Sequence, residues 1–437
     1  MVRNWQRCCS SGVVGALAML GVLSAASAKA EEFVTALPPV WQQSFGTSGD
    51  ELALAVAASQ GNVYTAGYTT GMFGLESVGG QDVFVTNHDA QGTLLWVRQL
   101  GSPAHDRAVA MTADPAGNVY VTGYTWGSLV TGVPNRGGTD IFVAKYNAQG
   151  ERLWVRQLGT EMDDFGTGVA VRRNGQDGLV VAGYSLGRFD SSASPGNYDV
   201  VVVKFDQAGN EYWRQQFGTG RSDVALGVAL GDSEDIYIAG HTQGSLDGVT
   251  SPGTTVDLFV ACYGLSGHQR WVRQLGSTSD EYGTGVAVRR ASPEGPDLIY
   301  VSGYTFGALD GNVRAGSYDA VLVKYDGAGN RQWTRQLGTT TSDYAQGVAV
   351  DDAGNVHLAG YTAGSLAGNP SLGGTDLFAA TYDAEGRRLA THQAGTPGTD
   401  RGQGVATSSD GALYLVGYTW TTTSSGANHY DGLLIRY

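Results

Sequence analysis

An acidic side chain recurs seven times at one position of a repeated pattern. It stands five residues after the glycine that ends an apolar run of the form Trp-x-Arg-Gln-Leu-Gly, or a variant of it. The seven residues are Glu51, Asp106, Asp164, Asp223, Glu281, Asp343 and Asp400. Carboxylate oxygens that converge on one axis suit Ca²⁺, whereas a carboxylate in a linker can accept backbone N–H bonds there. Occurrence in every copy favours the structural role, with Ca²⁺ as the alternative, and the sequence indicates no other cofactor.

A second position changes its residue type while its neighbours stay constant. It follows Gly-Tyr-Thr, or a near variant, and holds Thr70, Trp126, Leu186, Gln243, Phe306, Ala363 and Trp420. Large aromatic side chains among Gly, Ser and Asn residues stack on sugar rings or anchor protein partners. We therefore predict that Trp126, Phe306 and Trp420 bind a ligand. The alternative interpretation is that they fill gaps between neighbouring structural units.

Catalytic motifs give no comparable signal. The chain has no His-Glu-x-x-His zinc motif, and its seven histidines are scattered. We predict no catalytic residue and a protein that is not an enzyme. The alternative is a hydrolase or lyase outside the cytoplasm, in which carboxylates from distant loops meet around an axial pocket, because such pairs leave no local pattern in a sequence.

The repeated unit itself consists of strands. Its Gly-Tyr-Thr triplets begin 56 to 63 residues apart, at Gly67, Gly123, Gly183, Gly240, Gly303, Gly360 and Gly417. The second unit has four runs rich in Val, Ile, Tyr, Phe and Trp, at residues 107–111, 118–124, 140–146 and 152–158. Such runs, bounded by Gly, Asn and Asp, are typical of strands. The mature chain is therefore predicted to be all β.

A four-stranded antiparallel unit repeated at this period is the blade of a β-propeller. The seventh unit stops at Tyr437 with only three strands, while residues 40–46 resemble a fourth strand without a unit of its own. Pairing the two ends leaves no open sheet edge. We predict one closed seven-bladed propeller over residues 31–437, with residues 37–46 as the closing strand. Its blades should begin near residues 47, 102, 160, 219, 277, 339 and 396.

The repeat resembles the bacterial β-propeller repeat known as SBBP. The matching pattern is Asp-x-Phe-Val-x-Lys-Tyr-x-x-x-Gly-x-x-x-Trp-x-Arg-Gln-Leu-Gly, seen from Asp140 to Gly159, together with Gly-Val-Ala-Val and Val-Tyr-x-x-Gly-Tyr-Thr. The resemblance covers about residues 37–437. It implies the propeller fold and a secreted or cell-surface setting. It implies no catalytic residue, since the shared residues are those that build blades.

The N-terminal segment is typical of a secretory signal peptide. Arg3 and Arg7 precede an apolar run that is too short to span a bilayer, and Ala28-Lys29-Ala30 follows. Cleavage after Ala30 would leave 24 Lys and Arg residues against 41 Asp and Glu residues, a formal net charge of −17. We expect a secreted, periplasmic or cell-surface protein that does not insert into the membrane.

The composition of the mature chain limits its partners and its covalent chemistry. A strongly acidic surface repels nucleic acid, whose binding needs clustered Lys and Arg. Cys262 would be the one remaining cysteine, so no intramolecular disulfide is expected, and a buried thiol is predicted there. We expect a monomer that presents its loop-rich face to a protein or glycan partner as a non-enzymatic scaffold.

Overall fold

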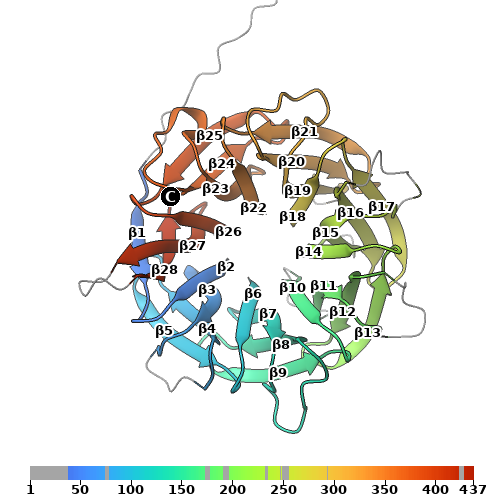
Figure 1. The fold of residues 1–437 in the computed structure, drawn as a ribbon, viewed down its shortest axis with the longest axis vertical. Coiled ribbons are helices and arrows are strands. Elements are labelled where there is room, and N and C mark those ends of the chain that lie inside the picture. Colours follow the sequence, from blue (N-terminus) through green and yellow to red (C-terminus); the bar gives the residue numbers. More distant parts are fainter. Residues whose placement is uncertain are drawn as a thin grey trace, which may run out of the picture. The chain divides into compact units, whose positions relative to one another are not determined.

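Seven four-stranded antiparallel sheets form a ring in the computed structural model of this protein (Figure 1). The structure describes residues 38–437 except 74–77, 173–177, 190–195, 232–234, 247, 249–254, 293 and 423–427. Within these residues the one helical element is the short 3-10 helix η1 (Leu366–Gly368). No helix in the described part of the chain is long and apolar enough to cross a membrane. The predicted all-β, seven-bladed propeller is confirmed.

Each blade runs from an inner strand beside the central channel to an outer strand at the rim (Figure 1). The first three blades are β2 (Glu51–Ser59), β3 (Asn62–Thr69), β4 (Asp82–His88), β5 (Leu94–Leu100); β6 (Asp106–Ala113), β7 (Val119–Thr125), β8 (Asp140–Tyr146), β9 (Arg152–Leu158); and β10 (Asp164–Val171), β11 (Leu179–Ser185), β12 (Asp199–Phe205), β13 (Glu211–Phe217). The fourth and fifth are β14 (Asp223–Leu230), β15 (Asp235–Thr242), β16 (Asp257–Gly264), β17 (Gln269–Leu275); and β18 (Glu281–Arg290), β19 (Asp297–Thr305), β20 (Asp319–Asp326), β21 (Arg331–Leu337). The sixth and seventh are β22 (Asp343–Val350), β23 (Val356–Thr362), β24 (Asp376–Tyr382), β25 (Arg388–Ala394); and β26 (Asp400–Thr407), β27 (Leu413–Thr422), β28 (Asn428–Arg436), β1 (Trp41–Phe45).

The N-terminal strand completes the last blade, as predicted. β1 pairs antiparallel with β28, from Trp41 opposite Arg436 to Phe45 opposite Gly432. The Trp41 indole N–H donates to the carbonyl of Ala90 in the first blade at 3.0 Å. The Phe45 ring lies edge-on to Phe84 of that blade, with 5.9 Å between centroids. The two ends of the chain therefore close the ring together and brace it against the first blade.

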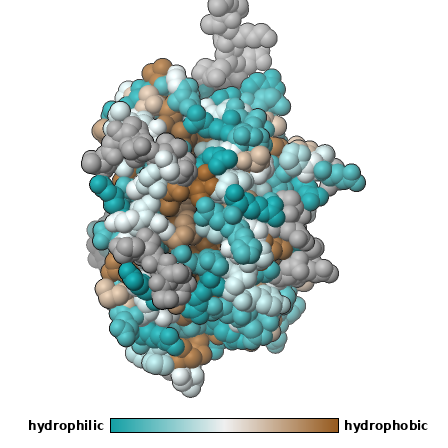
Figure 2. Space-filling view, turned by 90° about the vertical axis from the view of Figure 1, so that its right-hand side faces the viewer, coloured by the Kyte–Doolittle hydropathy of each residue, from teal (hydrophilic) through white to brown (hydrophobic). Residues whose placement is uncertain are grey.

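The hydrophobic core lies between adjacent blades. Side chains of β8 alternate: Phe142 and Ala144 belong to the cluster shared with the first blade, whereas Ile141 and Val143 belong to the cluster shared with the third. This alternation is the period-2 geometry of a strand, applied to a sheet that is covered on both faces. It explains why the middle strands are almost wholly buried. Seen edge-on, the rim is mainly hydrophilic, with smaller hydrophobic patches between (Figure 2).

Outer strands also bond to the next blade. The Trp96 indole donates to the carbonyl of Ala148 at 3.0 Å, and Arg98 Nε donates to the carbonyl of Gly150 at 2.7 Å. The sixth blade has Ala390 and His392 at these positions. Its neighbour there is the seventh blade, where the chain ends replace the turn that would accept such bonds, and Tyr437 packs on His392 at 4.4 Å.

Cys262 occupies the middle of β16, where it is buried and free. Burial raises the pKa of its thiol to about 12. A thiol that stays protonated is a poor nucleophile. The prediction of a buried thiol is confirmed, and Cys262 functions as a small core residue.

Candidate functional site

The seven repeated carboxylates are buried at the start of the inner strands. Each accepts the backbone N–H and the hydroxyl of a Thr or Ser four residues earlier, namely Thr47, Ser102, Thr160, Thr219, Ser277, Thr339 and Thr396. In six blades it also accepts the hydroxyl that ends the second strand. The carboxylate thus ties the incoming linker to the first two strands of its own blade.

Burial opposes the ionisation of five of these carboxyls, Asp106, Asp164, Asp223, Glu281 and Asp343. Burial raises the pKa of Asp106 and Asp343, and raises that of Asp164 to about 6, with the nearby Asp140 adding to the shift. The hydrogen bonds they accept work in the opposite direction but do not cancel the effect of burial. The described residues contain no group of three or more His, Cys, Asp or Glu side chains arranged to hold a metal ion.

One short segment matches the Gly-x-Ser-x-Gly pattern of serine hydrolases, Gly183-Tyr184-Ser185-Leu186-Gly187. In those enzymes the serine stands exposed on a strand-to-helix turn. Ser185 instead ends β11, is buried, and donates its hydroxyl hydrogen to Asp164. It is the counterpart of the threonine at this place in the other blades. The match is therefore structural and marks no nucleophile.

A belt of mainly aromatic side chains, with two arginines and two aliphatic residues among them, lies at the end of the ring where the inner strands begin. Its members are the second residue of each inner strand and the residue opposite it, which is the Tyr or His of the Gly-Tyr-Thr triplet. We call these fourteen residues the aromatic belt: Leu52 and Tyr68, Arg107 and Tyr124, Phe165 and Tyr184, Val224 and His241, Tyr282 and Tyr304, Tyr344 and Tyr361, Arg401 and Tyr418.

The belt is continuous across most blade junctions. Phe165 packs between Tyr124 of the second blade at 4.9 Å and Tyr184 of its own blade at 4.8 Å. Tyr304 and Tyr344 join the fifth and sixth blades at 4.9 Å. Burial raises the pKa of Tyr68, Tyr184 and Tyr304, so these phenols stay neutral. A partner would therefore meet aromatic rings and neutral hydroxyl groups here.

Two arginines interrupt the acidic surface within the belt. The guanidinium of Arg107 lies over the Tyr68 ring at 4.7 Å, and that of Arg401 lies over Tyr361 at 5.1 Å. Cation–π contacts of this kind stabilise an arginine while leaving N–H groups for other acceptors. The belt was not predicted, because in the sequence the tyrosines of the triplet are only the constant neighbours of the variable position. The signal that reveals it is the strand register, which places each tyrosine opposite the residue after the repeated carboxylate.

The three predicted ligand-binding residues continue this belt outward. Trp126, Phe306 and Trp420 are 39%, 37% and 38% exposed. Trp126 packs against Tyr124 at 5.2 Å between ring centroids, and the Arg314 guanidinium lies over Phe306 at 4.1 Å. Trp126 and Phe306 directly follow β7 and β19, and Trp420 lies at the same place of the repeat near the end of β27, so all three share one end of the ring. They lie on blades two, five and seven and form no single pocket.

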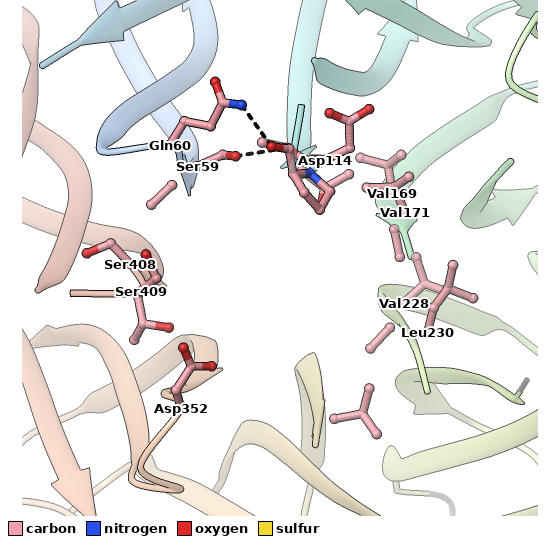
Figure 3. A pocket seen from close by; sticks show the side chains of 18 of the residues that line it. Ser59, Gln60, Asp114, Val169, Val171, Val228, Leu230, Asp352, Ser408 and Ser409 are labelled. Atoms are coloured by element: carbon pink, nitrogen blue, oxygen red, sulfur yellow. Dashed lines mark hydrogen bonds between the residues drawn. The ribbon is translucent and has the colours of Figure 1, made fainter. Parts of the chain in front are cut away.

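The central channel has a different character. Its waist, a cavity of about 200 Å³, is lined mainly by Ala, Val, Gly and Leu of the inner strands. The opposite mouth holds a pocket of about 660 Å³, with Val169, Val228 and Leu230 on one side and Asp352 and Ser408 on the other (Figure 3). A carboxylate in this pocket, Asp114, accepts the backbone N–H of Ala116 and of Asn118 within its own turn. Its position is explained by that turn.

Comparison with known proteins agrees with this architecture. The SBBP beta-propeller repeat model matches residues 95–129 and 332–367. The regulatory protein FlaEY of Caulobacter vibrioides is 28% identical in an alignment 390 residues long, which covers 81% of this chain and 39% of that protein. The uncharacterized WD repeat-containing protein L264 of Acanthamoeba polyphaga mimivirus is 23% identical in an alignment 363 residues long, which covers 63% of this chain and 26% of that protein. The chain thus spans well under half the length of both relatives.

Among solved structures, a polysaccharide lyase of family PL25, an ulvan lyase, superposes with a TM-score of 0.51. The alignment covers 89% of this chain and 95% of the lyase at 11% identity. Likeness at this identity concerns the fold and not the activity. The resemblance to the SBBP repeat is confirmed: the chain carries this beta-propeller repeat in a ring of seven blades.

Proposed function

We propose that this protein is a non-enzymatic binding scaffold that holds a protein or glycan partner on its loop-rich face, the end that carries the aromatic belt. The observation that carries the proposal is the belt together with its exposed extensions, Trp126, Phe306 and Trp420. Aromatic rings offer a large contact area at little cost in conformational entropy, and they dominate the energetics of binding sites.

The rigid fold supports a scaffold role. Ring closure and the bonds of the buried carboxylates fix the two inner strands that carry the belt. A surface fixed before binding loses little entropy when a partner arrives. The arginines Arg107 and Arg401 would select acceptor groups such as carboxylates or sugar hydroxyls. The net charge of −17 expected for the mature chain opposes nucleic acid as the partner.

The alternative function, a hydrolase or lyase, needs carboxylates that converge around the axial pocket. The waist of the channel offers Ala, Val and Gly in their place, and the two carboxylates of the mouth pocket, Asp114 and Asp352, lie on opposite sides of it (Figure 3). We therefore propose the binding role over the enzymatic one. We further propose that the protein is exported as a monomer after cleavage behind Ala30; this predicted signal peptide lies outside the described residues.

Replacement of Trp126, Phe306 and Trp420 together by Ala is expected to abolish partner binding. Each exposed aromatic anchor contributes on the order of 2 kcal/mol, about a thirtyfold change in affinity. The measurement is binding of the mature protein to a glycan array, and to proteins captured from the native cell envelope. The matched control replaces Leu153 and Tyr212, exposed apolar residues of the outer strands β9 and β13, by Ala. If the triple variant bound the partner as tightly as the unmodified protein does, the proposal would be wrong.

A further inference from the structure

In six blades the loop after the second strand folds back and inserts an apolar side chain between neighbouring blades. We call this residue the plug. Its backbone N–H donates to the Oε1 atom of the outer-strand glutamine of the same blade. The six plugs are Phe73, Leu129, Phe189, Leu246, Leu309 and Leu366. Each stands two residues after a glycine.

The second blade shows what the plug contacts. Leu129 N–H donates to Gln157 Oε1 at 2.9 Å, and Gln157 Nε2 donates to the carbonyl of Gly127 at 2.9 Å. The Leu129 side chain packs on the core cluster that contains Phe142. Gly127 lies against the preceding linker, since a Cβ there would approach Ser102 Oγ within 2.1 Å. Glutamine, linker and core residue thus form the seat of the plug.

The seventh blade has the linker and the core residue of such a seat, but its sequence from Thr421 to Ala427 contains no Leu or Phe. After Thr419 the chain continues as strand, and β27 and β28 stay paired as far as Thr422 opposite Asn428. The two strands therefore extend the sheet by three residue pairs beyond Thr419 and Asp431. At the place of the outer-strand glutamine stands Ser44, which is exposed.

A pocket of about 540 Å³ lies at this seat. It is lined by Ser44, by the linker Thr396-Pro397-Gly398, by Trp420 and by Leu433. By strand position these residues correspond to Gln157, Ser102–Ala104, Trp126 and Phe142, the surroundings of the second blade's plug. The volume falls within the range of about 300–1,000 Å³ that is usual for ligand sites.

We propose that this pocket binds an extended peptide segment of a partner protein that carries Gly-x-Leu or Gly-x-Phe. The six internal plugs define the occupant, because each places this sequence on an equivalent seat. The leucine side chain would cover Leu433 beside the Trp420 ring, and the glycine would lie on the linker Thr396–Gly398. The inference rests on the proposed function and assigns to it one site and one partner chemistry.

The test is a ligand-observed NMR titration of the mature protein with the peptide Ala-Gly-Ser-Leu-Ala-Gly, which copies residues 363–368. Binding is expected, and a peptide with Asp in place of Leu should bind at least about tenfold more weakly, since burial of a leucine contributes about 1.5–3 kcal/mol. Ser44→Phe fills the pocket from an exposed position and should abolish binding. Ser44→Gln restores the missing acceptor and should tighten binding about fivefold, the effect of one added hydrogen bond.

The matched pair of tryptophan variants separates this inference from the proposed function. Trp420→Ala should weaken peptide binding about tenfold, whereas Trp126→Ala, at the same position of a plugged blade, should leave it unchanged. Absence of peptide binding, or equal binding by the Ser44→Phe variant, would overturn the inference. Partner capture that depends on Trp126 and Phe306 would then still support the proposed function. If the peptide binds but no partner is captured through Trp126 and Phe306, the result would support the peptide site beside Trp420 and contradict partner binding by the aromatic belt.

Discussion

A protein that lacks residues 38–46 is expected to lose the closed ring. Deletion removes β1, uncovers the hydrogen-bonding edge of β28, and exposes Leu434 and Val416 in the core beneath Trp41 and Phe45. The loss is on the order of 5 kcal/mol, comparable to the whole stability of many domains. An open edge also pairs readily with other chains. We expect unfolding at much lower urea concentration, followed by self-association, as measured by circular dichroism and size-exclusion chromatography.

Exposed residues of the same strand provide the control for this deletion. Gln42→Ala with Ser44→Ala keeps the β1 backbone and both aromatic side chains, and it should change stability by less than about 0.5 kcal/mol. The replacements Trp41→Ala and Phe45→Ala should each lower the stability by an amount between that of the deletion and that of the double Ala variant. If the deletion variant unfolded at the wild-type urea midpoint and stayed monomeric, ring closure by β1 would not hold the fold together.

Replacement of a repeated carboxylate by Ala is the second large expected effect. Asp164→Ala removes the acceptor of the Thr160 backbone N–H, at 2.6 Å, of the Thr160 hydroxyl, at 2.9 Å, and of the Ser185 hydroxyl. One buried donor, the Ser185 hydroxyl, and two half-buried donors of Thr160 are left without this partner, which costs about 3 kcal/mol. The measurement is the urea midpoint of unfolding. Asp164→Glu is the matched control and should be mild, because Glu51 and Glu281 make the same bonds in their blades.

The pH dependence of Asp164 provides an independent check on its burial. Its folded-state pKa is raised to about 6 from an ordinary value of 3.8, so the folded protein binds this proton more tightly than the unfolded chain. The contribution to stability is therefore present at low pH and is lost as pH rises through about 6. Relative to Asp164→Asn, the wild type should be about 1.4 kcal/mol more stable at pH 5 than at pH 7.5.

The comparison with Asp164→Asn is needed because two buried histidines change the stability with pH in the opposite direction. Burial lowers the pKa of His88 and of His241 to about 4, so each destabilises the fold as pH falls below about 6.5. Both histidines are present in the wild type and in Asp164→Asn, and their contributions cancel in the difference. A difference that stays constant between pH 5 and pH 7.5 would contradict the raised pKa of Asp164.

The fold could be predicted from the sequence because the strands and turns of each blade have local sequence patterns that repeat seven times. Each blade shows four apolar runs at fixed spacing, with glycine at tight turns such as Gly117 and Gly150, whose φ values are +78°. Closure was predictable because residues 431–437 lack an outer partner and residues 40–46 lack a blade. A strand with an unpaired edge is unfavourable, so the two ends had to meet.

The binding face could be predicted only in part. The exposure of Trp126, Phe306 and Trp420 follows from their place directly after the repeated Gly-Tyr-Thr triplet. The belt depends on side chains from different blades, such as Tyr124 and Phe165, and only the register and the ring bring these together. The pocket beside Trp420 is even harder to predict from the sequence. It coincides with a connection that has no Leu or Phe, and the departure at Ser44 lies 376 residues before Trp420 along the sequence.

Site-specific photocrosslinking tests the central claim, that the loop-rich face carries the partner, most directly. A photoreactive phenylalanine analogue placed at Trp126 or at Phe306 should give a covalent adduct of recurring mass in the native cell envelope. The same analogue at Leu153 or Tyr212, on the outer strands, should give none. Adducts from the outer-strand positions alone, or from all four positions equally, would contradict the assignment of partner binding to the aromatic belt.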